Sequence, residues 1–367
     1  MSHEELFYLL ALQKTDGIGD ALAKKLLVAF GSAEAVFKAS IRDLTTSGRI
    51  PRAAAANIRS QKSFGAARDE LNYILKHNIA VLQFQKPGYP DRLNHCPDAP
   101  LLLFSSGTID LSNPRMIGIV GTRNMTAHGA DFTRQFISDL APLNPVIVSG
   151  FAYGIDIVAH QAAVEHGLQT LAIIGSGLAR VYPASHKKHV EPICRNGGFL
   201  SEFWSNTEPE KENFVKRNRI VAGICEATVV IESAERGGSL ITAQFAADYN
   251  REVFAVPGRP SDVYSAGCNT LIKTQKAQAL TSAADLVYLL NWQLESSVGK
   301  PVQKQLFVEL DELEQTLYDF LRKRGPEQLD IIALECRIPI SKLSSALLQM
   351  ELKGVIRTLP GKQFESI

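Results

Sequence analysis

Small residues follow several short apolar segments of the chain, at points where a ligand could reach the backbone. Four such turns can be identified: Gly121 and Thr122 in GIVGTR, Ser149 and Gly150, Gly175 to Gly177, and Arg236 to Ser239. A short strand that ends on glycine and opens into a helix commonly holds a phosphate, because the first amides of a helix have no intrahelical partner. A tight turn alone would explain any single glycine. Four turns at one edge of a sheet favour a phosphate-binding site.

Basic side chains lie close to the same turns. Arg123 extends the first turn, Lys187 and Lys188 lie in YPASHKKH, and Arg217 and Arg219 belong to KRNR. One or two cations would serve a mononucleotide, whereas a line of cations suits the phosphates of a polynucleotide. Lys188 could equally be solvated, and Arg217 could equally be paired with an acid inside the fold. Arg123 is the strongest candidate because it stands on the glycine turn itself.

Dinucleotide and triphosphate cofactors do not fit these turns. A dinucleotide fingerprint would be followed, about 20 residues later, by an acidic residue at the end of the next strand. Here that strand ends in Ser149 and Gly150, and no glycine run ends in the Gly-Lys-Ser/Thr of a Walker loop. We therefore expect no bound cofactor. Aromatic residues in the same segments could stack on bases, or could equally belong to a core: Tyr182, Phe203, Trp204 and Phe214.

Candidates for catalysis or metal binding are few. Asp156 and His160, four residues apart, would share a helix face, and with Glu232 they could serve acid–base chemistry or hold a metal. We favour a structural interpretation, in which Asp156 caps the helix and His160 packs against or hydrogen-bonds a neighbouring loop. The pair His186 and His189, three residues apart, has no nearby carboxylate that could complete a metal site other than Glu191. The five cysteines are scattered without a C-x-x-C pair, so neither zinc nor a disulfide framework is indicated. We predict no catalytic residue and no metal.

The elements that must position these residues follow a βαβ pattern. From about residue 79 onward, short segments rich in Val and Ile alternate with helical stretches, which is typical of a doubly wound, mainly parallel sheet. We predict an α/β fold with an extended Rossmann-like domain over residues 69–292. Residues 293–306 are polar and contain Gly and Pro, as expected of a linker. Three helices and a terminal hairpin predict a winged-helix domain over residues 307–367, which could bind a duplex or a protein.

The first 68 residues have a helical pattern and are predicted to form an all-α domain. The segment TDGIGD lies between two of its helices, just before Lys24 and Lys25. It resembles a helix-hairpin-helix or SAM-like module, which can offer backbone amides to a DNA phosphate. A plain helical hairpin explains the segment equally well.

Composition sets broad limits on the function. The formal net charge is +1, which neither demands nor excludes a polyanionic partner. No apolar run approaches the ~18 residues that cross a bilayer, and the N-terminus carries acids where a signal peptide carries basic residues. We therefore expect a cytoplasmic protein without membrane contact.

A series of motifs runs through the central region: GTR at 121–123, SGFAYGIDIVAH at 149–160, YP at 182–183, SE at 201–202, FVKRNRIVAG at 214–223, GGSLITAQFA at 237–246, VFAVPG at 253–258 and GCNTLI at 267–272. In the residues of each motif and in the order of the motifs along the chain, this series resembles the DNA-processing protein A family. The resemblance implies a protein without enzymatic activity that binds incoming single-stranded DNA during natural transformation. It further implies protection of that DNA from nucleases, loading of RecA recombinase onto it, and a homodimer formed through the Rossmann-like domain.

The resemblance places a DNA pocket in the turns already identified. Asn218 enters the predicted site only through this resemblance. Turns, cations and resemblance together give the predicted DNA-binding residues: Gly121, Thr122, Arg123, Ser149, Gly150, Lys187, Lys188, Arg217, Asn218, Arg219, Gly238 and Ser239.

The chain departs from the family pattern at three places. Gly237-Gly238-Ser239-Leu240 stands where Ser-Gly-Ser-Leu is common, and His186 stands in place of an asparagine. After GCNTLI the usual Gly-Ala-x-Leu is replaced by KTQKAQAL, a segment near the family's dimer and RecA surfaces.

Two other functions agree with parts of the pattern. Phosphoribohydrolases of the lysine-decarboxylase-like group resemble this chain in fold, but their P-G-G-x-G-T-x-x-E loop carries a catalytic glutamate. The corresponding loop here, ERGGSLITAQ, has Gln244 and no such acid. A regulator of duplex DNA would act through the winged helix. The positive charge of that segment is modest, because several acids oppose its basic residues Lys342, Lys353, Arg357 and Lys362.

Overall fold

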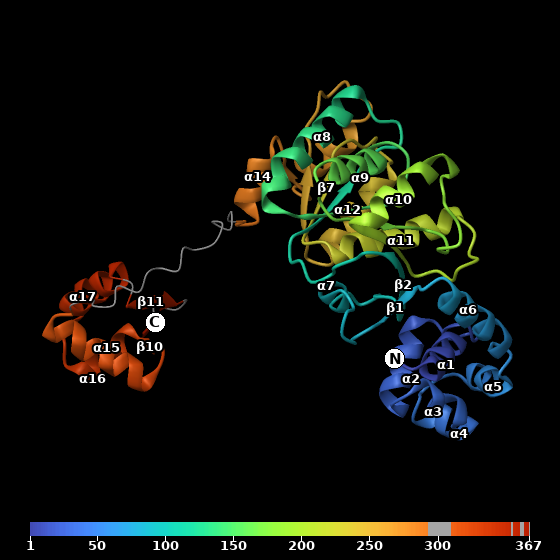
Figure 1. Ribbon diagram of the computed structural model, residues 1–367, viewed down its shortest axis with the longest axis horizontal. Coiled ribbons are helices and arrows are strands. Elements are labelled where there is room, and N and C mark those ends of the chain that lie inside the picture. The colour runs from blue at the N-terminus through green and yellow to red at the C-terminus, as the bar shows by residue number, and fades with distance from the viewer. Residues whose placement is uncertain (293–309, 354, 360–362, 367) are drawn as a thin grey trace. The chain divides into compact units, whose positions relative to one another are not determined.

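A computed structural model describes residues 1–292, 310–353, 355–359 and 363–366 of the protein. The chain divides into two compact units, Met1–Leu294 and Glu295–Ile367 (Figure 1). The predicted linker, residues 293–306, lies outside the described residues. No helix in the described part of the chain combines the length and apolar character that crossing a membrane requires.

The first unit begins with a helical region, as the sequence predicts. Ser2 caps the first helix by accepting a hydrogen bond from the amide of Glu5, at 3.1 Å, and the turn TDGIGD bends at Gly17, where φ is +81°. The last helix runs across residue 68, where the sequence analysis places a domain boundary. Buried side chains of the helices share one core with Leu102 and Phe104 of the sheet, so the two parts pack as one unit. The helices are α1 (His3–Gln13), α2 (Asp20–Phe30), α3 (Ala33–Lys38), α4 (Ile41–Thr46), α5 (Arg52–Ser60) and α6 (Phe64–Lys76).

A nine-stranded, mainly parallel sheet forms the centre of the first unit, which confirms the predicted α/β class. The strand order is β1-β2-β6-β5-β4-β3-β7-β8-β9, and only β1 with β2 and β2 with β6 pair antiparallel. The sequence analysis did not identify β6, whose two glycines are poor strand formers, or the two-residue β9. The strands are β1 (Ala80–Gln83), β2 (Leu102–Gly107), β3 (Met116–Val120), β4 (Val146–Ser149), β5 (Thr170–Ile173), β6 (Gly197–Ser201), β7 (Ala227–Val230), β8 (Glu252–Ala255) and β9 (Gln278–Ala279).

Helices cover both faces of this sheet, because its strands are apolar on both sides. Alternate residues of β3 show the two faces: Ile117 and Ile119 pack with α8, α9 and α14, whereas Met116 and Val120 pack with α11, α12 and α13. The helical segments of this part are α7 (Asp91–Asn94), α8 (Ala127–Leu140), η1 (Ala141–Leu143), α9 (Ile155–Glu165), η2 (Ala184–His189), α10 (Val190–Arg195), α11 (Lys211–Ile224), α12 (Gly238–Asp248), α13 (Ala266–Lys273) and α14 (Ala283–Leu289).

The strand order reverses between β3 and β7. From β3 the chain builds outward through β4, β5 and β6, and it then returns to place β7 on the other side of β3. The loops that follow β3 and β7 therefore lead away in opposite directions. A crevice opens at such a switch point at the carboxyl ends of the strands, where doubly wound proteins bind their ligands.

The second unit is a winged helix, which confirms the prediction for the C-terminal region. Three helices pack around Leu317, Leu321, Leu343 and Leu347, and a small antiparallel sheet has the order β10-β12-β11. Asp311 and Glu314 form a capping box at the start of the first helix. The elements are α15 (Glu312–Arg324), β10 (Glu327–Gln328), α16 (Leu329–Cys336), α17 (Ile340–Leu352), β11 (Ile356–Leu359) and β12 (Gln363–Ser366).

Candidate functional site

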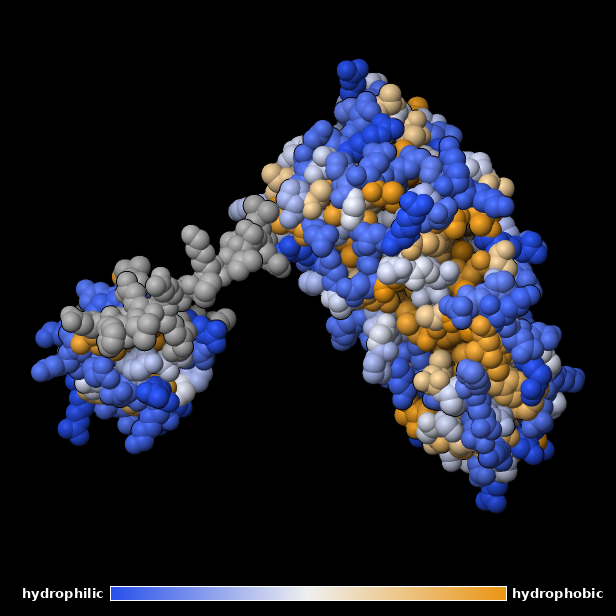
Figure 2. All heavy atoms as spheres, viewed as in Figure 1, coloured by the Kyte–Doolittle hydropathy of each residue, from blue (hydrophilic) through white to orange (hydrophobic). Residues whose placement is uncertain are grey.

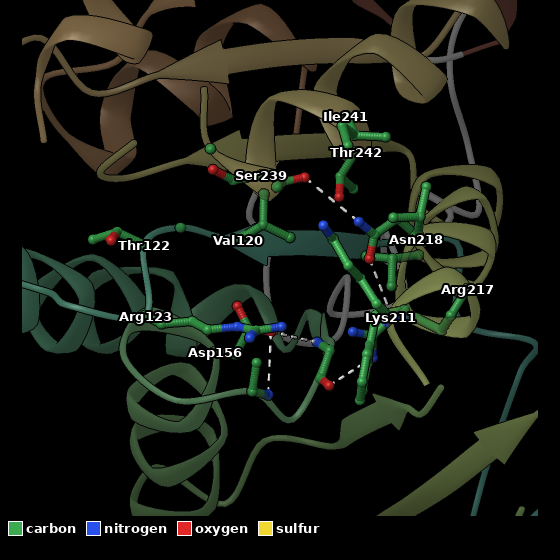
Figure 3. A pocket seen from close by; sticks show the side chains of 18 of the residues that line it. Val120, Thr122, Arg123, Asp156, Lys211, Arg217, Asn218, Ser239, Ile241 and Thr242 are labelled. Atoms are coloured by element: carbon green, nitrogen blue, oxygen red, sulfur yellow. Dashed lines mark hydrogen bonds between the residues drawn. The ribbon is translucent and has the colours of Figure 1, made fainter. Parts of the chain in front are cut away.

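A cleft of about 680 Å³ lies at the carboxyl ends of β3 and β7, where the strand order reverses. The loop after β3, the loop after β4, helix α11 and the start of α12 form its walls. Figure 3 shows Arg123 and Lys211 pointing into this space from two different elements. Eight of the predicted residues line the cleft: Gly121, Thr122, Arg123, Gly150, Arg217, Asn218, Gly238 and Ser239.

Backbone contacts hold the loop after β3 in place. The Thr122 amide donates to the carbonyl oxygen of Glu232 at 2.7 Å, and the Thr122 carbonyl accepts from the Ile155 amide at 3.2 Å. Gly154 lies against this loop with φ at +77°, and a Cβ there would be 2.1 Å from the Thr122 carbonyl oxygen. Only glycine fits this position. The loop therefore presents the exposed side chain of Arg123 from a fixed backbone.

One face of α11 forms the opposite wall. Lys211, Phe214 and Asn218 follow one another at i, i+3 and i+7, so they share a face, and all three line the cleft. The ring of Phe214 lies 5.5 Å from that of Tyr182 and 5.7 Å from the guanidinium of Arg123. Cations and aromatic rings thus alternate across the cleft, as they do in sites that hold phosphates and stack bases.

Arg217 supports the cleft from below rather than reaching out of it. Arg217 is 3% exposed, and its guanidinium donates to the carbonyl oxygens of Gly150, at 2.6 Å, and of Ile173. These carbonyls end β4 and β5, so one side chain ties two strand ends together. Burial lowers the pKa of Arg217 to about 10, against the opposing effect of Asp156 and with a smaller contribution from Arg123. Arg217 is therefore charged at neutral pH.

Asp156 fixes the loop after β4. Its carboxylate accepts from the amides of Gly150, at 3.1 Å, and of Ala152, at 3.3 Å. Burial raises the pKa of Asp156, although the nearby Arg217 and these amides oppose the shift. A Cβ on Gly150 would come within 2.6 Å of both Asp156 and Arg217. The small residue is needed here because the two charged groups close around the backbone.

The start of α12 supplies amide groups to the cleft. Gly237 caps the helix without a side-chain hydrogen bond, and the space around a Cβ on Gly238 is open. The first amides of a helix lack intrahelical partners and carry part of the positive end of the helix dipole. The Ser239 hydroxyl donates instead to the Ser233 hydroxyl, at 2.9 Å. An anion would therefore meet the backbone of Gly238 and Ser239 rather than the serine side chain.

Asn218 bridges α11 and α12. Its side-chain amide nitrogen lies 3.5 Å from the carbonyl oxygen of Gly238, and its amide oxygen accepts from Arg217 at 3.2 Å. These two contacts set the orientation of the amide group, which lies on the cleft face of α11 (Figure 3).

Four predicted residues do not line the cleft. The Ser149 side chain is fully buried and its hydroxyl donates to the Ile119 carbonyl at 2.6 Å. Lys187 and Lys188 are exposed on η2, outside the cleft. Their segment folds back onto the core through His186, whose ring packs on Phe151. The structure thus places the two lysines beside the site and Ser149 beneath it.

Arg219 lies on another face of α11, where it is 6% exposed. Its guanidinium donates to the buried carboxylate of Glu202 and lies 3.8 Å from that of Asp98. Burial raises the pKa of Glu202, an effect that Arg219 and Lys216 oppose. The charge of Arg219 is thus already paired inside the fold, contrary to its prediction as part of an open cation track.

The residues considered for catalysis do not form a common centre. His160 is fully buried, and burial lowers its pKa to about 3. The Thr170 hydroxyl donates to the Ile147 carbonyl at 2.8 Å, so the hydroxyl accepts from Nδ1–H of His160 at 2.7 Å. Glu232 accepts from the amide and hydroxyl of Thr126, at 2.9 and 2.5 Å, and so fixes the start of α8. Asp156 and His160 are therefore both structural, as expected, but Asp156 does not cap α9: the N-cap is Gly154, and Asp156 instead holds the amides of Gly150 and Ala152 before the helix.

No group of three or more His, Cys, Asp or Glu side chains among the described residues is arranged to hold a metal ion. The five cysteines are free thiols.

Two cations of the cleft are not among the predicted site residues. Lys211 begins α11 and Arg236 belongs to the loop after β7, and both are exposed. Helical periodicity could have identified Lys211, since it stands three residues before Phe214 and seven before Asn218. The same periodicity separates Arg219 from Asn218, because adjacent residues point about 100° apart around a helix. Arg236 also had a signal, since it begins the turn Arg236 to Ser239 that the pattern places at the same sheet edge as Gly121 and Thr122.

Comparison with known proteins gives a consistent picture. Residues 80–291 match the family described as DNA recombination-mediator protein A, and residues 303–362 match the DprA winged helix domain. The protein Smf of Synechocystis is 30% identical over 402 aligned residues, which cover 100% of both chains. The DNA processing protein DprA of Streptococcus pneumoniae is 41% identical over 199 residues, which cover 54% of this chain and 70% of that protein.

Two solved structures resemble the chain. The X-ray structure of DprA from Streptococcus pneumoniae has a TM-score of 0.67 and 31% identity, and the match covers 78% of this chain and 98% of that one. DNA processing protein A of Helicobacter pylori, described for its single-stranded DNA binding mode, has a TM-score of 0.53 and 28% identity. That match covers 58% of this chain and 95% of that one.

Proposed function

The chain belongs to the DNA recombination-mediator protein A family, and from this premise we propose that its cleft binds single-stranded DNA. The observation that carries the proposal is the meeting of three kinds of group in one cleft. Arg123, Lys211 and Arg236 provide positive charge, Tyr182 and Phe214 provide aromatic rings, and the start of α12 provides amides. A single strand can use all three, since cations and amides hold its phosphates and aromatic rings stack on its bases.

The proposed role of this DNA binding in the cell is inferred from the family. We propose that the protein shields incoming single-stranded DNA and loads RecA recombinase onto it during natural transformation, as a cytoplasmic homodimer. Binding without chemistry agrees with the cleft, because its acid Asp156 is occupied by two backbone amides. The relative from Helicobacter pylori, described for binding single-stranded DNA, supports the choice of ligand.

The test measures binding of fluorescein-labelled oligo-dT by anisotropy over a salt series. Each neutralised phosphate contributes roughly −0.7 to the slope of log affinity against log salt for a single strand. We expect Arg123→Ala to weaken binding about tenfold at moderate salt and to make this slope less steep by roughly one phosphate contact. Arg180→Ala is the matched control, since Arg180 is exposed near the same region but pairs with Glu208. Equal affinity of Arg123→Ala and the parent would disprove the site.

RecA loading requires a separate assay. On oligo-dT coated with a single-strand-binding protein, we expect the parent chain to shorten the lag before RecA filaments form. Arg123→Ala should lose this effect in proportion to its loss of DNA affinity. A parent chain that binds oligo-dT but leaves the lag unchanged would contradict RecA loading while leaving the DNA site intact.

No observation specifically supports either of the two alternative functions, the phosphoribohydrolase or the regulator of duplex DNA. The carboxylate of Glu232 is engaged by Thr126, and α12 carries Gln244 where a phosphoribohydrolase carries its glutamate. Base release from nucleoside monophosphates at an enzymatic rate, abolished by Glu232→Gln, would favour the hydrolase. For the winged helix, α17 carries one lysine, Lys342, and one acid, Glu351, which gives little attraction to duplex phosphates.

A further inference from the structure

A second hollow, which shares no residue with the DNA cleft, lies on the helical region. Its volume is about 700 Å³, and its walls are the second half of α2, the turn after α4 and the residues that follow β1. Figure 1 shows these elements in the part of the first unit that holds the N-terminus. The proposed DNA site makes no use of this hollow.

The floor of the hollow is apolar. Leu9 and Leu101 are each 1% exposed and lie at its base, and Leu27 and Phe84 are partly exposed beside them. Val28 stands at the edge with 85% of its side chain exposed. Figure 2 shows apolar residues at the surface where the helical region meets the sheet. Clustered apolar side chains in a hollow indicate a contact surface, whereas single exposed ones do not.

The rim of the hollow is strongly basic. Lys24, Lys25, Arg49 and Lys86 line it, against the single acid Glu5. Lys25, Arg49 and Lys86 are exposed, and none of the three has an ion-pair partner among the residues that the structure describes. Three uncompensated cations around an apolar floor call for a partner with the opposite charge.

The aromatic ring of the hollow is already covered. The ammonium of Lys24 lies 3.8 Å from the centroid of the Phe84 ring and donates to the Ala99 carbonyl. The ring of Tyr89 meets the same ring edge-on, with the centroids 5.8 Å apart. A base would have to displace Lys24 to stack on Phe84, so the hollow lacks the stacking surface that single-stranded nucleic acid uses. Its apolar floor instead suits the side chains of a protein.

We propose that this hollow docks an acidic amphipathic helix of a partner protein. Apolar residues of that helix at i, i+3, i+4 and i+7 would cover Leu27 and Val28, in the helix-in-groove mode of recognition. Acidic residues along its flanks would face Lys25, Arg49 and Lys86. The site is independent of the DNA cleft, so the protein could hold its strand and this partner together.

The test uses the full chain and a synthetic probe. The probe is a fluorescein-labelled peptide of two heptads, with leucine on one helical face, glutamate on the flanks and alanine elsewhere. We expect saturable binding by anisotropy, weakened at least tenfold by the double variant Lys25→Glu and Lys86→Glu. The matched control reverses two exposed lysines of the same region that do not line the hollow, Lys62→Glu and Lys76→Glu, and should stay within twofold of the parent.

Further variants and probes distinguish the contribution of charge from that of apolar contact, and peptide binding from nucleic-acid binding. Val28→Ser, at an exposed position, should weaken peptide binding about threefold without changing the midpoint temperature of thermal unfolding. A peptide with lysine in place of glutamate should not bind. The proposal is overturned if the acidic peptide does not saturate, or if the double reversal and its control weaken it equally. It is also overturned if the double reversal weakens the binding of oligo-dT as strongly as the binding of the peptide, because the hollow would then bind nucleic acid.

Discussion

Helix α11 presents similar side chains to two different surroundings. On its cleft face, Lys211 and Asn218 are open to a ligand, whereas on another face Arg219 is 6% exposed and paired with Glu202. Arg217 lies between them, buried yet at the base of the cleft. Basic residues of one helix therefore have different roles, because the group that satisfies each charge differs. An open cation acts through ligand affinity, and a paired, buried one acts through stability.

The strongest test of this comparison is Arg219→Ala. Removing one partner of a buried ion pair leaves an uncompensated charge and typically costs about 3–5 kcal/mol, so urea unfolding should show a large loss of stability. Under conditions where the variant is still folded, its affinity for oligo-dT should stay within twofold of that of the parent. Lys216→Ala is the control, since Lys216 also faces Glu202, at 3.5 Å, but is 54% exposed, and its loss should cost under about 1 kcal/mol. An Arg219→Ala protein of normal stability and weak affinity would reverse our assignment.

Arg217→Ala should combine both effects. It leaves the carbonyls of Gly150 and Ile173 without their donor, at a cost of about 2–4 kcal/mol for two buried acceptors. Because the loop from Gly150 to Ala152 lines the cleft, the affinity for oligo-dT should fall as well. Urea unfolding and anisotropy on the same sample measure the two effects. A loss of affinity with unchanged stability would place Arg217 with the open cations instead.

The pH dependence of stability tests the buried group His160. Its folded-state pKa of about 3 lies below the ordinary value of 6.5, so between these pH values the unfolded chain binds more protons than the folded one. Stability is therefore fully present above pH 6.5 and falls as pH decreases toward 3, by at most about 1.4 kcal/mol per pH unit for one proton. The His160→Gln variant should show a shallower fall, whereas His128→Gln, at an exposed position, should follow the parent. Parallel curves for His160→Gln and the parent would show that the fall comes from other groups.

The smallest effect is expected for Lys187→Ala and Lys188→Ala. Both lysines are exposed outside the cleft, and salt screens charges over about 8 Å at physiological ionic strength. Each variant should change oligo-dT affinity by less than twofold at moderate salt, with a larger effect at low salt. A tenfold loss would show that the strand crosses η2, as the sequence pattern predicts.

Three of the four predicted turns line the cleft, because their position depends on local features, whereas Gly175 to Gly177 do not line it. Glycine next to a buried strand places amides at a helix start, so Gly121, Gly150 and Gly238 were found from the pattern and lie in the cleft. The N-terminal and C-terminal regions were likewise predicted from helical periodicity and a terminal hairpin. The motif series from GTR to GCNTLI was sufficient to indicate the family.

Tertiary structure alone decided which cations are available to a ligand. The sequence determined that basic residues gather near glycine turns, but not that Glu202, 17 residues before Arg219, would be its buried partner. The pattern placed the turn that begins at Arg236 at the same sheet edge as Arg123, but it did not show that both side chains would be exposed at one cleft. The physical reason is that a charge is available only when no other group satisfies it. For Arg219 on α11 that group is Glu202, which follows β6, and only the packing of α11 against this strand end brings the two charges together.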